Sequence, residues 1–231
     1  MGRDDVMKMI SQRKRIWGWY FFDWATQPYN TLLLTFIFGP YCTTTLATNL
    51  MADGMAQQAA QAQAQAQASW GWGLAIAGVL IAVLAPILGA IADNSGRKLP
   101  WIWLFSAMYF IGSGALWWTA PQDFSAVWAL FFFGVGLIGM AFATIFTNSY
   151  LPDLHDNPDE LGPISGSGWA FGYIGGLVAL VIMLGLFQAT ASGLTMVGFS
   201  PLFGLDPATK ADTRIVGPFG AICVAVFMIP L

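Results

Sequence analysis

Three polar side chains, Asp23, Gln27 and Asn30, recur along an apolar stretch near the start of the chain. Intervals of four and three residues place all three on one face of a helix. An ionisable side chain inside a membrane helix is costly, and it usually faces a cavity or a partner. This stripe therefore makes Asp23 a candidate for binding a proton or a solute. The alternative is an interfacial acid that meets water or a base, because helical rise places Asp23 only about 9 Å beyond Trp17.

Pro28 lies inside the same stretch. Proline cannot donate a hydrogen bond to the carbonyl of Trp24, and its ring clashes there, so we expect a kink beside Gln27 and Asn30. Freed carbonyls next to polar side chains are typical of the broken helices that bind solutes in membrane proteins. Kinks also serve packing alone, and this alternative stays open.

A second polar face is predicted near residue 146, where Thr144, Thr147 and Asn148 lie within about one helical turn. These side chains are candidates for lining the same cavity as the Asp23 stripe. The alternative is hydrogen bonding between helices, which is the commoner use of threonine and asparagine in membranes.

Glycines at 168, 172 and 176 recur every four residues in a later apolar stretch. This spacing leaves one helical face without side chains and predicts the close approach of another helix. In a protein that changes conformation, such a face is also a place where helices slide or rock.

A charged connection joins two apolar stretches at residues 89–98. It combines an acid, two glycines that flank a turn and two bases, namely Gly89, Asp93, Gly96, Arg97 and Lys98. A tight charged turn is a poor lipid-facing loop but is suited to a conformational latch. Because a guanidinium can bind a carboxylate through two hydrogen bonds, we expect Arg97 to pair with Asp153 or Asp93. The alternative is that Arg97 and Lys98 only determine topology.

Composition separates this chain from soluble proteins and from several functional classes. Of its 231 residues, 57% are hydrophobic and 9% are charged, whereas a soluble domain has about a quarter charged residues. The single histidine and the distant pair Cys42 and Cys223 argue against a metal site or a disulfide framework. We expect no cofactor and no nucleic-acid partner. No nucleophile–base pair and no phosphate-binding loop emerges, so neither an enzyme nor an ATP-driven pump is expected.

The apolar segments predict an all-α membrane protein. Residues 1–16 form a polar, basic N-terminal segment, and residues 17–231 form six transmembrane helices. The predicted spans are 17–47, 70–92, 99–119, 124–151, 164–189 and 215–231. The first is too long for one perpendicular crossing, so it must tilt or bend, and Pro28 and Pro40 are two places to bend. The alanine- and glutamine-rich residues 56–68 predict a helical lead on the solvent side.

The last predicted span, 215–231, ends without a polar flank. A sixth helix that enters the cytoplasm should end in charged residues. We therefore expect this chain to be the N-terminal half of a longer protein.

Basic residues set the expected orientation. Seven of the nine lie before the first span or between the second and third spans, and only Lys210 and Arg214 lie on the opposite side. The positive-inside rule therefore places the N-terminus in the cytoplasm. The expected location is a bacterial inner membrane, or a vacuolar membrane if the source is eukaryotic.

The charged connection resembles the signature G-x-x-x-D-x-x-G-[RK]-[RK] of the major facilitator superfamily, where it links the second and third membrane helices. Residues 22–30, FDWATQPYN, resemble a signature of the vacuole-effluxer (autophagy-related) branch, and residues 148–153 and 172–176 are similar to that branch as well. The resemblance implies a twelve-helix fold of two six-helix halves, of which this chain is the first. It also implies alternating access and export of small metabolites such as amino acids.

Residues and resemblance together predict a secondary active transporter. Its expected partners are a small polar solute, a coupling proton or ion, the lipid bilayer and the second six-helix half. One alternative is a non-transporting membrane assembly or scaffold protein of the same fold, which would need no intramembrane acid. Another is a channel-like pore, which the latch disfavours because a latch serves alternating states.

Overall fold

The computed structural model describes residues 3–95 and 98–230, with side chains described for residues 11–91 and 98–230. Within these ranges the chain forms only helices and the loops between them. The α-helices are α1 (Arg3–Pro28), α2 (Phe38–Ala52), α3 (Ala59–Ser95), α4 (Leu99–Ala115), α5 (Ala126–Asn148), α6 (Leu161–Ile182), α7 (Ala211–Arg214) and α8 (Val216–Phe227). The π-helices are η1 (Tyr29–Phe36) and η6 (Met183–Phe187), and the short 3₁₀ turns are η2 (Leu116–Trp118), η3 (Pro121–Asp123), η4 (Leu151–Asp153), η5 (Pro158–Glu160), η7 (Leu202–Gly204) and η8 (Pro207–Thr209).

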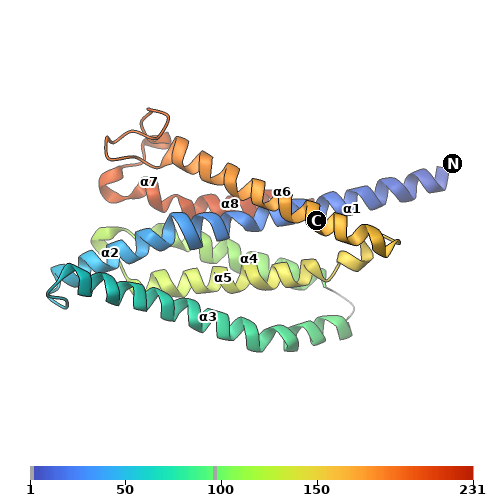
Figure 1. The fold of residues 1–231 in the computed structure, drawn as a ribbon, viewed down its shortest axis with the longest axis horizontal. Coiled ribbons are helices and arrows are strands. Elements are labelled where there is room, and N and C mark those ends of the chain that lie inside the picture. The colour runs from blue at the N-terminus through green and yellow to red at the C-terminus, as the bar shows by residue number, and fades with distance from the viewer. Residues whose placement is uncertain (1–2, 96–97, 231) are drawn as a thin grey trace.

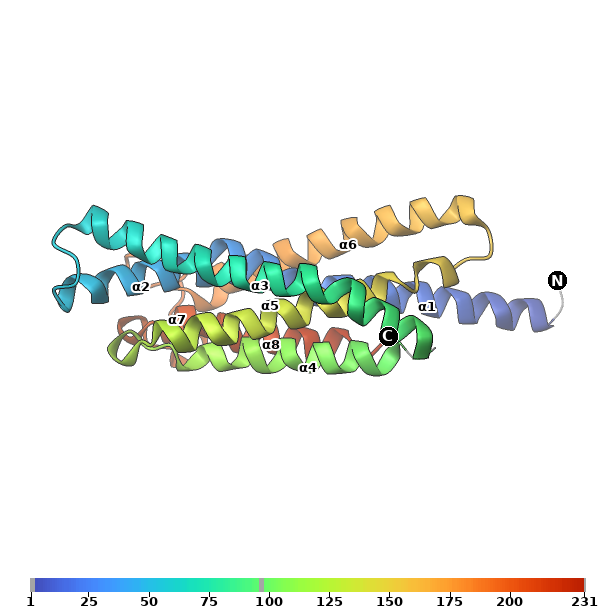
Figure 2. The same ribbon diagram turned by 90° about the horizontal axis from the view of Figure 1, so that it is seen from below.

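The long helices run side by side in an elongated bundle (Figures 1 and 2). The start of α1 extends beyond one end of this bundle, and the turn between α2 and α3 extends beyond the other. In Figure 1, α6 and α3 lie on opposite sides, with α1, α4, α5 and α8 between them.

Five helical segments are long and apolar enough to cross a membrane, and they confirm the predicted all-α membrane protein. They are Ser11–Ala52, Ala59–Ile91, Leu99–Trp118, Ala126–Asp153 and Pro158–Phe187. The predicted sixth span, 215–231, contains the 12-residue helix α8, which packs against α4 and α1. The count of six crossings stays a prediction.

The first membrane segment is helical from end to end but changes its winding between its two prolines. Pro28 is the last residue of α1, and the chain continues as the π-helix η1. The wider winding is visible where the Ile37 amide donates to the Leu32 carbonyl, five residues back, at 2.9 Å. Pro40 lies in the first turn of α2. Backbone N–H groups have no partner within the helix there, so a proline removes no helical hydrogen bond. Pro28 thus lies directly before η1 and Pro40 four residues after its end, with the non-helical Ile37 between η1 and α2.

A layer of aromatic side chains joins η1 to α4 and α5 at the centre of the bundle. The Tyr29 hydroxyl donates to the Phe133 carbonyl, and its ring packs edge-on against Tyr109 with 5.0 Å between centroids. The Tyr109 hydroxyl in turn donates to the Ala25 carbonyl at 3.3 Å. These tyrosines are fully buried, so they fix the height of α1 relative to α4 and α5.

The alanine- and glutamine-rich tract begins α3 and packs against α2. The predicted helix is present, and its Ala62 and Ala66 are buried against Ala47 of α2. Alanine at intervals of four residues lets the two helices approach closely while the glutamines stay outside. Further along α3, Trp72, Ile76 and Val83 are exposed, as expected of a helix that faces lipid.

Helices α4 and α5 touch through glycine, and this contact gives a test of the packing. A methyl group on Gly139 of α5 would lie 2.5 Å from the Tyr109 amide nitrogen and 2.6 Å from the Phe105 carbonyl oxygen. Because these are backbone atoms, Gly139→Ala must push the helices apart, and we expect it to lower stability by about 1–3 kcal/mol. Thermal unfolding in detergent measures this loss.

Gly134→Ala on the same helix is the control for that change, since nothing lies within 4 Å of an added methyl group there. Alanine is the better helix former, so this variant should be as stable as the wild type or slightly more stable. Equal melting temperatures for the two variants would contradict the α4–α5 contact.

Candidate functional site

The polar stripe of α1 lies against the glycine face of α6. An added methyl group at Gly172 would lie 2.6 Å from Asp23 Oδ2 and 3.1 Å from Gln27 Cγ, and one at Gly176 would lie 3.4 Å from Gln27 Cβ. A methyl group at Gly175 would meet the Trp24 ring at 2.6 Å. The close approach that the glycine spacing predicted is therefore made by α1. Its polar side chains occupy the space that α6 leaves free.

Asp23 carries a buried oxygen without a partner. Its Oδ2 has no hydrogen bond among the described residues, and the nearby Thr26 hydroxyl donates instead to the Asp23 carbonyl at 3.0 Å. Burying an unpaired charged oxygen is costly, so this contact is stable only if the carboxyl group gains a proton, a cation or a hydrogen-bond donor. Asp23 is thus the one ionisable side chain of the stripe, and it is incompletely satisfied.

Gln27 and Asn30 continue the stripe to the start of η1. Gln27 is buried between the helices, whereas Asn30 is partly exposed and its carbonyl accepts the Thr35 hydroxyl at 2.8 Å. This bond spans five residues, as the wider π-helix requires. Asp23 and Gln27 share one face of α1, which α6 covers, and the next contact with α6 along the chain comes from Thr31 of η1, against Gly176. Asn30 belongs to η1, and its place on this face stays a prediction.

The second predicted polar group serves mainly the packing of α5. The Thr144 hydroxyl donates to the Met140 carbonyl of its own helix at 2.8 Å, and Asn148 is exposed at the helix end. Between them, the Thr147 carbonyl accepts a hydrogen bond from Trp19 Nε1 at 3.2 Å. The described contacts therefore join Thr147 to α1 near Trp19, and they leave the role of Thr144 and Asn148 in a solute path as a prediction.

An aromatic cluster closes the α1–α6 interface beside Asp23. Phe171 of α6 packs against four rings of α1, with centroid distances of 4.7 Å to Trp24 and 5.5 Å to Phe21. Phe227 of α8 stacks on Phe21 at 6.2 Å. Sequence reasoning did not identify this cluster, although the five aromatic residues between 17 and 22 were a visible signal. The cluster therefore joins α1 to both α6 and α8.

Lys98 attaches the charged connection to the end of α5. Its Nζ donates to the Ser149 carbonyl at 3.2 Å and lies 5.5 Å from the centroid of the Tyr150 ring. Of the other predicted latch residues, Gly89 and Asp93 belong to α3, and the side chain of Asp93 lies outside the described part of the chain. Gly96 and Arg97 lie outside the described residues, so the pairing of Arg97 with Asp153 or Asp93 stays a prediction.

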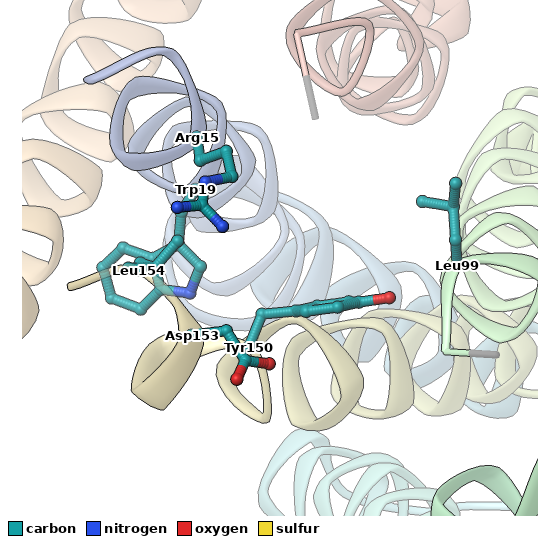
Figure 3. A pocket seen from close by; sticks show the side chains of 6 residues that line it. All are labelled: Arg15, Trp19, Leu99, Tyr150, Asp153 and Leu154. Carbon is teal, nitrogen blue, oxygen red and sulfur yellow. The ribbon is translucent and has the colours of Figure 1, made fainter. Parts of the chain in front are cut away.

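A cavity of about 390 Å³ opens at the same end of the bundle (Figure 3). Its lining residues are Arg15, Trp19, Leu99, Tyr150, Asp153 and Leu154. Figure 3 shows the Arg15 guanidinium on α1 and the Asp153 carboxylate on η4 apart from each other. Gln12 holds these elements together by donating to the Leu154 carbonyl at 3.2 Å. Asp153 therefore lines the same cavity as Arg15, a base that precedes the first span and that the sequence analysis did not assign to this site.

The described residues contain no group of three or more metal-ligating side chains. Cys42 and Cys223 are both buried and free. Along the described part of α1, the site offers hydrogen-bonding groups and one carboxyl group beside the glycine face of α6.

Comparisons with known proteins agree with the motifs. A family model described as vacuole effluxer Atg22 like matches residues 11–200. Over 180 residues the chain is 26% identical to YxiO, an uncharacterized MFS-type transporter of Bacillus subtilis (strain 168). That match covers 78% of this chain and 38% of the relative, so the chain spans well under half of the relative's length. No solved structure matches. Both matches confirm the resemblance inferred from the sequence.

The Lys98 contact predicts a local loss of stability. Lys98→Gln removes a hydrogen bond from a charged donor and the contact with the Tyr150 ring, so we expect a loss of about 1–2 kcal/mol. Thermal unfolding of the purified protein measures it. Lys14→Gln is the control, because Lys14 is an exposed lysine at the same end of the bundle. If both variants have the melting temperature of the wild type, Lys98 does not attach the charged connection to α5.

Proposed function

This chain belongs to the vacuole effluxer Atg22-like family, and we propose that it moves a small polar solute across a membrane by alternating access. The single observation that carries this proposal is the buried, unpartnered Oδ2 of Asp23 at an interface lined by glycine. An ionisable group in this position is costly for stability, and function is the usual reason for keeping one in a membrane span.

The proposed cycle opens and closes the contact between α1 and α6. Helix α1 is held to α5 by the Trp19–Thr147 hydrogen bond and to α4 by the Tyr109–Ala25 hydrogen bond. The contact with α6 depends instead on small residues and aromatic rings, which can separate without breaking strong hydrogen bonds. When α6 moves away, Asp23 and Gln27 meet water, a proton or the solute. When it returns, they are dehydrated again.

The proposed coupling particle is a proton or another cation bound by Asp23. Asp23 Oδ2 is buried without a hydrogen-bond donor, and the Gln27 side chain packs against the same glycine, Gly172. The proposed solute is an amino acid or a related metabolite, which rests on the resemblance of residues 22–30 to the vacuole-effluxer branch, since the family description names an effluxer and no solute. Asn30, Thr144 and Asn148 are proposed to extend the solute path beyond this point.

The proposed orientation places the N-terminus, Lys98 and Asp153 in the cytoplasm, because basic residues collect on that side. Arg15 and Asp153 would then form a cytoplasmic gate across the 390 Å³ cavity. The relative is much longer than this chain, and we propose that a second six-helix half completes the transporter.

Asp23→Asn tests the central residue. The amide keeps the shape of the side chain but cannot take up a proton, so we expect coupled transport to fall by about tenfold or more while insertion stays normal. Uptake of radiolabelled amino acids into proteoliposomes under an imposed proton gradient measures this loss. The reconstituted protein is the full-length chain, with any second half that it carries. Asp159→Asn, at an exposed acid outside both the stripe and the cavity, is a control for the loss of a carboxylate. Wild-type uptake by Asp23→Asn would reduce Asp23 to an interfacial acid.

Gly172→Ala tests the interface rather than the charge. The added methyl group meets the flexible end of Asp23, which can move aside, so we expect transport to fall several-fold while the melting temperature changes by only about 2–4 °C. Gly166→Ala on the same helix is the control, because nothing lies within 4 Å of its added methyl group. Equal transport by both variants would contradict the proposed role of the α1–α6 contact. No uptake by the wild type would favour a scaffold protein.

A further inference from the structure

Residues 189–205, here called the apolar loop, follow η6 and contain no charged side chain. Several large side chains nevertheless point away from the protein: Met196 is 71% exposed, Phe199 65% and Phe203 82%. Exposed apolar side chains gathered on one loop usually mark an interaction surface. The apolar loop therefore needs an apolar partner that the described bundle does not supply.

Backbone hydrogen bonds hold the apolar loop in a defined shape. The Thr190 amide donates to the Leu194 carbonyl at 2.8 Å, and the Thr195 amide donates to the Phe199 carbonyl at 2.7 Å. Phe203 adopts a positive φ of 61°, an unfavourable backbone conformation for a bulky residue, and its ring still points outward. The exposed side chains are thus presented by a folded segment.

Two hydrogen bonds place the apolar loop at the end of a membrane span. The Met196 amide donates to the Leu184 carbonyl at 3.2 Å, within the last turn of the segment Pro158–Phe187. The Ala189 amide donates to Asp212 Oδ2 at 2.9 Å, which ties the start of the loop to α7. Figure 1 shows the loop beyond the end of α6, on the side of the bundle away from α3.

We propose that the apolar loop inserts Met196, Phe199 and Phe203 into the interfacial region of the lipid bilayer. Its surface continues the exposed apolar face of α6, where Leu177 and Val181 are 59% and 70% exposed. An irregular backbone cannot enter the hydrocarbon core with its polar groups unsatisfied, but the headgroup region supplies water and lipid acceptors. Aromatic rings favour this region, and the lack of charge removes the main cost of entering it. The loop is thus an anchor for the end of α6.

Lipid-borne quenchers test the anchor directly. Cysteine is introduced at Phe203 or Phe199 in a protein whose buried Cys42 and Cys223 are replaced by alanine, and the new thiol carries an environment-sensitive fluorophore. The labelled full-length protein is reconstituted in vesicles whose phospholipids carry a nitroxide either near the headgroup or deep in the acyl chain. Ala208→Cys in η8, exposed but outside the apolar loop, is the matched control.

The proposal predicts that shallow nitroxides quench labels at positions 199 and 203 about twofold more than the label at 208, and that deep nitroxides quench them less. Phe203→Asp should reduce the quenching of a label at 199, since a charge disfavours insertion. Labels at 199 and 203 that are quenched no more than the label at 208 would overturn the proposal, and quenching of those labels by a water-soluble agent would then indicate a free loop. Protection from both kinds of quencher would also overturn it, in favour of contact with another part of a longer chain or a second copy.

Discussion

The close approach of α1 and α6 is the contact on which the rest of this structure depends. Glycine on α6 leaves room for Asp23, Gln27 and Trp24 of α1, and any larger residue there would displace them. The same approach dehydrates a carboxyl oxygen that has no partner. Packing and function therefore oppose each other at one place, because the interface is tight enough to bury Asp23 but lacks the hydrogen bonds that would make this burial permanent.

The two sides of that interface are attached to different parts of the protein. Helix α1 is joined to α4 and α5 by the tyrosine layer and by Trp19, and it also packs against α8, although its most extensive contact is with α6. Helix α6 packs chiefly against α1 and η1, and its far end continues into the apolar loop. At the other end of the bundle, Lys98 and the cavity between Arg15 and Asp153 lie where α3, α4, α5 and α1 meet. A movement of α6 relative to α1, α4 and α5 therefore leaves the tyrosine layer intact.

Much of this arrangement follows from sequence periodicity, and the remainder depends on contacts between distant segments. The apolar spans, the stripe that begins at Asp23 and the glycine face at Gly172 are local patterns, and the structure contains each of them. That these two faces meet each other is not encoded in either pattern alone. Likewise, Lys98 contacts Ser149, and Arg15 and Asp153 line one cavity, only after the helices have packed. The π-helix after Pro28 could not be predicted from the sequence either, since a proline predicts that the helix is disrupted but not which winding replaces it.

The central claim is that Asp23 and Gly172 act together in transport. A double-mutant cycle with Asp23→Asn and Gly172→Ala, measured as coupled amino-acid uptake in proteoliposomes, tests this claim most directly. Because both changes disturb the same contact, the account predicts that the double variant loses little more activity than the more severe single variant, with a coupling energy of about 1 kcal/mol or more. Strictly additive losses would contradict it, since they would show that the carboxyl group and the glycine face work independently.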